Sequence, residues 1–148
     1  WRMGYGVMRT DLAQQVARLA TNSISCTASF SQMAGVEALR GSQISVEHMC
    51  SEFKRRRDLF VAGLNRIKGF SCRMPHGAFY VFPNIRKTGW KSKPLADALL
   101  EEAGVACLSG TSFGEFGEGY LRFSVANSIE NLGKALDRIQ ECVSSKSF

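Results

Sequence analysis

The 148-residue sequence has few of the residues that build metal sites and disulfide frameworks. It contains only two histidines, His48 and His76, which stand alone, and an odd number of cysteines with no CxxC pair. Zinc sites need clustered histidine and cysteine ligands, and disulfide scaffolds need cysteines in even number. We therefore expect no metal site, and we expect the five cysteines to be reduced, mostly buried thiols of an intracellular protein.

Long apolar runs are also missing. No stretch is apolar enough to cross a bilayer, and no signal peptide is visible. The net charge of +6 would allow polyanion binding, but the densest basic cluster, residues 54–57, lies in a helical pattern without an aromatic platform. We expect a solvated helix face there, no nucleic-acid or membrane partner, and a cytoplasmic location that leaves room for an upstream organelle-targeting segment.

The first half reads as strand, helix, loop and helix, and the second as a compact α+β unit. Hydrophobic periodicity and stop signals predict a strand at 2–8, a helix from the cap Thr10 to 20, a loop at 21–27, and helices at 29–39, ended by Gly41, and 45–67. In the second half, the same signals predict a hairpin-like pair at 70–74 and 78–82 and a helix at 95–103. A strand at 105–108, a glycine-rich loop at 109–119 and a strand at 120–125 follow, and the last helix is capped by Ser128.

A lone strand at residues 2–8 cannot satisfy its backbone groups without neighbouring strands, and residues 1–44 supply none. We therefore expect the chain to be the C-terminal part of a longer protein.

Two arginines stand in apolar, strand-like surroundings, at Arg2 and Arg122. The planar guanidinium suits a carboxylate or a phosphate, so both heads are candidates for binding small anions. Spacing alone favours the alternative, in which each side chain extends into solvent or pairs with an acid on a neighbouring strand.

Several segments resemble a known family in collinear order over nearly the whole chain: WRMGYGVM, SQMAGVEALRG, FKRRRDLFVAGLNRIKGFSC, MPHGAFYVFPNI, LLEEAGVACLSGTSFGEFGEGYLRFSVANS and ENLGKALDRI. Together they resemble the C-terminal portion of class I aminotransferases, fold-type I pyridoxal-phosphate enzymes, and within them the aspartate aminotransferase branch. The resemblance implies an α/β fold with an α+β small domain. Residues 1–47 would be the end of the large cofactor-binding domain, and residues 48–148 the small C-terminal domain.

The resemblance also implies roles for single residues. The family lysine that forms the Schiff base with pyridoxal 5'-phosphate precedes the segment that Trp1 opens, and the first lysine here is Lys54, so no catalytic residue is assigned. Arg2 matches the arginine that binds the cofactor phosphate, and Ser25 lies in a loop that in family dimers approaches the partner's cofactor. Arg122 matches the arginine that binds the substrate α-carboxylate.

Two further segments of the resemblance are weaker. Phe113 lies in SGTSFG, which resembles the family's PGSxFG loop with Ser109 in place of proline, and its ring is a candidate wall of the substrate site or a structural turn aromatic. GAFY at residues 77–80 resembles a strand of the small domain, and we expect its aromatic rings to be packed core anchors.

The implied activity is transfer of an amino group between an amino acid and a 2-oxo acid, in amino-acid metabolism and biosynthesis, by a homodimer. Aspartate and glutamate are the first candidates, followed by aromatic or prephenate-type substrates. A lyase of the same fold remains open, since fold does not fix the reaction. A non-catalytic remnant that acts as an interaction module also remains open, because no residue matches the Schiff-base lysine. On either reading we expect the chain alone to be inactive.

Overall fold

The computed structural model describes residues 2–145, and the chain divides into two compact units, Trp1–Glu47 and His48–Phe148. Residue 1 and residues 146–148, the outer ends of the two predicted domains, lie outside the described range. The assignment of the first unit to a large cofactor domain and of the second to a small domain stays a prediction.

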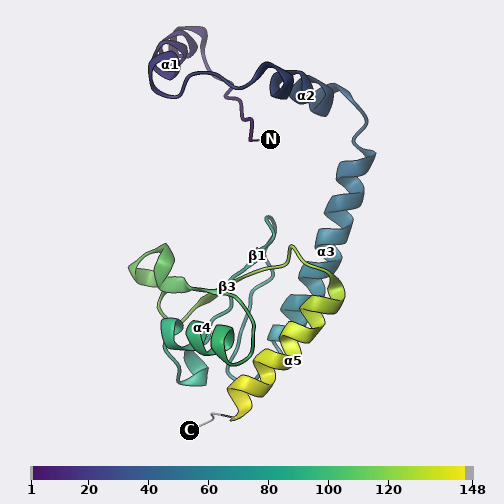
Figure 1. Ribbon diagram of the computed structural model, residues 1–148, viewed down its shortest axis with the longest axis vertical. Coiled ribbons are helices and arrows are strands. Elements are labelled where there is room, and N and C mark those ends of the chain that lie inside the picture. The colour runs from purple at the N-terminus through teal and green to yellow at the C-terminus, as the bar shows by residue number, and fades with distance from the viewer. Residues whose placement is uncertain (1, 146–148) are drawn as a thin grey trace. The chain divides into compact units, whose positions relative to one another are not determined.

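The first unit contains two helices, α1 (Thr10–Ser23) and α2 (Ser29–Arg40), and the first residues of α3 (Ile44–Leu64) (Figure 1). Gly41 caps α2, as the sequence predicts. The predicted start of α1 is wrong by one residue, because Arg9 is the N-cap and Thr10 is already helical. The helix also extends to Ser23, where Thr21, Asn22 and Ser23 donate side-chain hydrogen bonds to carbonyls four residues earlier.

The predicted strand at residues 2–8 does not form. These residues are exposed, and the described part of the first unit holds no strand that could pair with them. An isolated strand leaves its backbone donors and acceptors unpaired, so an irregular, solvated segment is the expected result. The sequence pattern was apolar enough for a strand, but the pairing partner was missing.

In the second unit, the described residues up to 145 form three α-helices packed against a small antiparallel sheet. The rest of α3, α4 (Ser92–Glu101) and α5 (Ile129–Ser145) accompany strands β1 (Tyr80–Val81), β2 (Leu108–Ser109) and β3 (Leu121–Ser124) in the order β1-β3-β2. Three short 3₁₀ helices are η1 (Arg86–Thr88), η2 (Gly110–Phe113) and η3 (Glu115–Gly117). Ser128 caps α5 as predicted, accepting a hydrogen bond from the Asn131 amide at 3.1 Å.

The core of this unit lies between the helices and one face of the sheet. It contains Phe60 and Leu64 of α3, and α5 runs beside α3 (Figure 1), where a Cβ on Gly63 would clash with Leu136. The sheet contributes buried side chains from alternate positions: Val81, Ser109, Leu121 and Phe123. Because successive strand residues point to opposite faces, Arg122 lies on the other, open face.

The predicted pairing of residues 70–74 with residues 78–82 does not form among the described residues. Ser71 and Asn84 form a single antiparallel bridge with N···O distances of 2.9 and 2.8 Å, and β1 pairs with β3 instead. The Asn65 side chain accepts a hydrogen bond from the Cys72 N–H at 2.7 Å and donates one to the Cys72 carbonyl at 3.0 Å. Because Cys72 follows the hydrogen-bonded residue Ser71, these two groups point away from Asn84, and Asn65 satisfies them on the outer edge.

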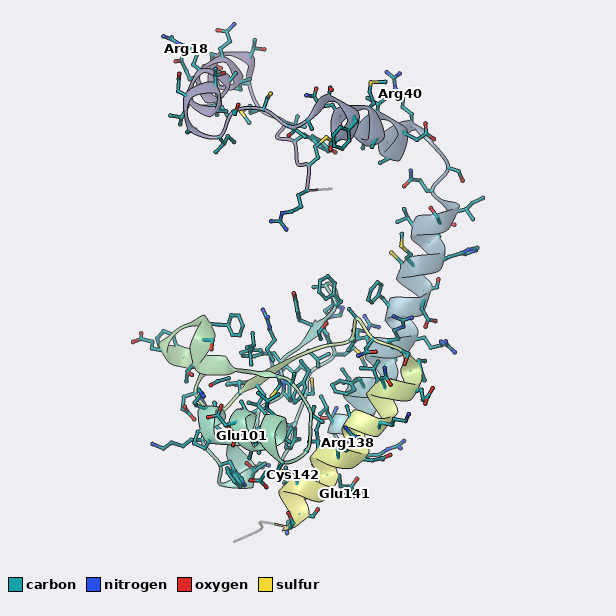
Figure 2. All side chains as sticks on the ribbon, in the orientation of Figure 1. Arg18, Arg40, Glu101, Arg138, Glu141 and Cys142 are labelled. Carbon is teal, nitrogen blue, oxygen red and sulfur yellow. The ribbon has the colours of Figure 1, made fainter. Side chains whose placement is uncertain are left out.

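The cysteines are less buried than the sequence suggested. All five are free thiols, but only Cys72 and Cys142 (Figure 2) are buried, while Cys107 is half-buried. Cys26 and Cys50 are exposed, so the prediction of mostly buried thiols is wrong for this chain. Among residues 2–145, no helix is long and apolar enough to span a membrane, and no group of His, Cys, Asp and Glu is arranged to hold a metal ion.

Cys107 is expected to resist alkylation while the protein is folded. Burial, together with the nearby charge of Asp97, raises the pKa of its thiol to about 12. Only the thiolate is strongly nucleophilic, so at pH 8.5 the folded protein should label at Cys26 and Cys50, and at Cys107 only after unfolding in urea. Mass spectrometry of iodoacetamide-treated protein measures this, and rapid labelling of Cys107 in the folded protein would contradict it.

Candidate functional site

Arg122 occupies the middle of the open sheet face. It lies in β3, opposite Leu108 of β2, and the β1–β3 register pairs Tyr80 with Ser124. Its neighbours in β3, Leu121 and Phe123, point into the core and are at most 3% exposed. The core therefore fixes the strand that carries the arginine, while the head group remains half-buried and accessible.

The Arg122 guanidinium contacts two aromatic rings. Its central carbon lies 4.2 Å from the centroid of Tyr80 in β1 and 4.4 Å from that of Phe113 in η2. Within residues 2–145, none of the salt bridges involves Arg122, so the alternative that it pairs with an acid on a neighbouring strand is not realised. The arrangement is a partly desolvated cation whose hydrogen-bonding edges are available to an anion.

The two rings belong to a larger aromatic row on the same face, made of Tyr80, Phe113, Phe82 and Tyr120. Phe82 meets Phe113 edge-on at 6.1 Å and stacks on Tyr120 at 5.3 Å. The expectation that the GAFY rings are core anchors is wrong, since Phe79 is 42% and Tyr80 38% exposed. Strand alternation explains Tyr80, because Val81 takes the buried position in β1, whereas Phe79 lies before the strand begins.

The loop that carries Phe113 is fixed by close backbone packing. A Cβ on Gly110 would lie 2.1 Å from the Gly117 carbonyl oxygen, and one on Gly117 would lie 1.9 Å from that of Gly110. Ser109, at the position of the family's proline, is buried and forms a 2.7 Å hydroxyl–hydroxyl hydrogen bond with Thr111. The serine therefore caps η2 and gives the turn a constraint that proline would supply through its ring.

A hydrogen-bond network around Ser92 ties the end of this loop to the start of α4. The buried Ser92 hydroxyl accepts from the amides of Gly119 at 2.7 Å and Tyr120 at 3.1 Å. The Glu118 carboxylate accepts from the Ser92 amide at 2.9 Å, and this bond lowers the pKa of Glu118. The network sets the point at which the chain enters β3, two residues before Arg122.

Ser92→Ala is expected to destabilise the second unit. Removing the hydroxyl takes away two hydrogen bonds, each worth about 0.5–1.5 kcal/mol, and leaves the two amides with more distant acceptors, Glu118 Oε1 at 3.1 Å for Gly119 and the Gly117 carbonyl at 3.2 Å for Tyr120. Urea unfolding measures the loss, and Ser51→Ala, at an exposed α3 position, is the matched control with little change. Equal stability of the Ser92 and Ser51 variants would contradict the role given to Ser92.

Arg2 and Ser25 both lie in the first unit. Arg2 is exposed, has a positive φ of 61°, and borders a hollow of about 430 Å³ beside α2, where Gly35 lets Met3 approach the helix. Ser25, at φ 64°, follows α1 and is also exposed, but it is not among the residues that line this hollow. Among residues 2–145, neither side chain forms a salt bridge or hydrogen bond, so a guanidinium and a hydroxyl are both available to a phosphate group.

The structure therefore brings Phe113 onto Arg122, whereas Arg2 and Ser25 belong to the other unit. Sequence reasoning missed Tyr80 as a neighbour of Arg122. Its position depends on the strand register, which no local pattern encodes. The alternation of β3 alone would have indicated that Arg122 and Tyr120 share a face.

Another charged hollow, of about 680 Å³, lies where α4 and α5 end. Arg138 stands there with Glu101 and Glu141 (Figure 2), and Glu102 adds a third carboxylate. The excess of negative charge disfavours an anionic ligand. The face around Arg122 is therefore the better candidate for an acidic substrate.

Comparison with known proteins gives one family. The profile described as "Aminotransferase class I and II" matches residues 1–139. The chain is 41% identical over 145 residues to an aspartate aminotransferase of Pyrococcus horikoshii, covering 97% of this chain and 37% of that protein. It is 36% identical over 150 residues to aromatic-amino-acid aminotransferase 2 of Thermococcus litoralis, covering 100% of this chain and 38% of that protein.

Comparison of the fold with solved structures points to the same family. The crystal structure of an aromatic aminotransferase from Pyrococcus horikoshii OT3 superposes with a TM-score of 0.84 at 36% identity, over 90% of this chain and 36% of that one. The chain thus spans a little over a third of the length of these relatives.

Proposed function

Because the chain belongs to the class I and II aminotransferases, we propose that it is the C-terminal portion of an enzyme that transfers an amino group between an amino acid and a 2-oxo acid. The observation that carries the proposal is the half-buried Arg122 on the open sheet face, in contact with Tyr80 and Phe113 and without an acidic partner among residues 2–145. Both substrates carry an α-carboxylate, and a guanidinium can bind it through two parallel hydrogen bonds.

In this proposal Arg122 contributes to catalysis by holding the substrate in position. Two-point binding fixes the substrate in one orientation, and well-oriented reactants react far faster than freely diffusing ones. The aromatic row excludes water from one side of the carboxylate, which strengthens its attraction to the guanidinium. Phe113 supplies part of this wall from the loop, and its contact with Arg122 supports the role proposed for it.

Pyridoxal 5'-phosphate is the proposed cofactor, and it would supply the electron sink that lets the α-proton of an amino acid be removed. Arg2 and Ser25 are the residues of this chain that we propose hold its phosphate, since both are exposed and offer donors suited to a dianion. No residue here matches the Schiff-base lysine, and residues 1–53 contain no lysine at all. We therefore also propose that this chain by itself does not catalyse amino-group transfer.

Aspartate and glutamate are the proposed substrates, with aromatic amino acids next. The names of the two relatives above support this order, one being an aspartate and the other an aromatic-amino-acid aminotransferase. A homodimer, a cytoplasmic location and the absence of nucleic-acid and membrane partners are part of the proposal and rest on the resemblance and composition alone.

The test is an assay of the full-length protein that contains this chain. Pairs of amino acid and 2-oxo acid should be interconverted, with no net release of ammonia, and aspartate or glutamate should give the highest kcat/KM. Ammonia release with equal amounts of 2-oxo acid would indicate the lyase alternative instead. Absence of any reaction, together with absence of cofactor in the purified protein, would favour a non-catalytic interaction module.

A further inference from the structure

We propose that Tyr80 is a positioning residue for Arg122: its ring holds the guanidinium in the orientation that receives the substrate carboxylate. The inference rests on the proposed function of Arg122 as the carboxylate ligand. Tyr80 itself would touch Arg122 and not the reacting atoms. Its effect on the reaction is therefore expected to pass entirely through the arginine.

The contact geometry supports this role. The 4.2 Å between the guanidinium carbon and the Tyr80 centroid is shorter than the other cation–ring distances of the second unit outside the Arg122 cluster, 5.6 Å for Arg56 over Phe53 and 5.4 Å for Arg86 over Tyr120. A cation within about 6 Å of a ring centroid is attracted by the negative face of the ring. The guanidinium carbon lies over the ring, and the N–H donors of Arg122 make no hydrogen bond among residues 2–145, so they stay free for a carboxylate.

The two rings that touch Arg122 differ in how they are held. Tyr80 lies in β1, where its backbone is in register with Ser124, and its ring packs on Phe79 at 4.5 Å. Phe113 lies at the end of η2, in the loop whose other end the Ser92 network holds. The two rings therefore reach Arg122 from two separately held elements, Tyr80 from a paired strand and Phe113 from the packed loop.

Without the Tyr80 ring, only Phe113 would restrain the long arginine side chain, which then samples more rotamers, and binding a carboxylate would have to order it. Removing the ring should therefore weaken binding of both substrates of an aminotransferase, because both present an α-carboxylate. The hydroxyl of Tyr80 forms no hydrogen bond among residues 2–145, so the ring and not the hydroxyl is the functional group. Phenylalanine should replace tyrosine with little loss.

The experiment compares variants of the full-length protein in half-reactions with an amino acid and with a 2-oxo acid. Tyr80→Leu is expected to raise KM for both substrates about tenfold, the upper part of the range for losing a cation–π contact, with a smaller change in kcat. Tyr80→Phe is expected to stay within about twofold of the parent for the same reason. Phe116→Leu removes a ring that is 87% exposed and is the control expected to change nothing.

A double-variant cycle separates this inference from the proposed function. If Tyr80 acts through Arg122, Tyr80→Leu should cause no further loss in the Arg122→Ala background. A loss of the same size in both backgrounds would overturn the inference, and so would normal KM values for Tyr80→Leu beside an impaired Arg122→Ala. An impaired Tyr80→Phe would also overturn it. Normal kinetics of Arg122→Ala would instead remove the proposed function of the arginine itself.

Discussion

Arg122→Ala in the full-length protein is expected to lower kcat/KM for amino-acid substrates by about 10²–10³-fold, because truncating one member of a buried, hydrogen-bonded charge pair costs about 2–5 kcal/mol. The arginine has no acidic partner among residues 2–145, so its removal leaves no carboxylate of the protein unpaired. The loss should therefore appear in catalysis and not in folding. Steady-state kinetics and urea unfolding of the same variant measure the two effects separately.

Two further variants make this prediction specific. Arg122→Lys keeps the positive charge but loses the planar fork, so it should recover only part of the lost activity. Arg56→Ala removes an arginine that also contacts a ring, Phe53, but that pairs with Glu52 on α3, and its kinetics should be unchanged. Wild-type kinetics of Arg122→Ala, or equal losses for Arg56→Ala, would remove Arg122 from the substrate site.

Phe60→Ala is expected to destabilise the second unit by about 3–5 kcal/mol, the usual cost of truncating a buried phenylalanine. The side chain is 1% exposed and meets Phe123 edge-to-face at 5.7 Å, on the core side of the strand that carries Arg122. The substitution therefore removes apolar burial and a ring contact directly beneath the site. Urea unfolding followed by circular dichroism measures the loss.

Leu100→Ala provides the comparison for Phe60. Leu100 belongs to α4 but is 55% exposed, so its truncation should change the free energy of unfolding by less than about 0.5 kcal/mol. If Phe60→Ala cost no more than Leu100→Ala, the described core would not be the structure that supports β3.

Local sequence signals predicted most of the helices. Periodic apolar residues located α2, α3 and α5, and Gly41 and Ser128 marked an end and a start because their effects act within one turn. The strands were harder, since pairing partners are set by distant residues. The segment at 2–8 has no partner among the described residues, and β1, which the sequence pairs with residues 70–74, pairs with β3 instead.

The candidate site was predictable to a similar extent. The sequence placed Arg122 in a strand and Phe113 in a glycine-rich loop, and the contact between them follows from the fold. Tyr80 was assigned to the core because a tyrosine in a short apolar run usually packs there. Only the β1–β3 register brings it to the open face beside the arginine, and a shift of one residue would have reversed that outcome.

The most direct test of the central claim is a crystal structure of the full-length protein with its cofactor and an unreactive amino-acid analogue. We expect the analogue's α-carboxylate to accept two hydrogen bonds from the Arg122 guanidinium, with N···O distances of about 2.7–2.9 Å. The guanidinium should remain on the Tyr80 ring. An analogue whose carboxylate is bound by other residues, with the Arg122 head left in solvent, would contradict the account.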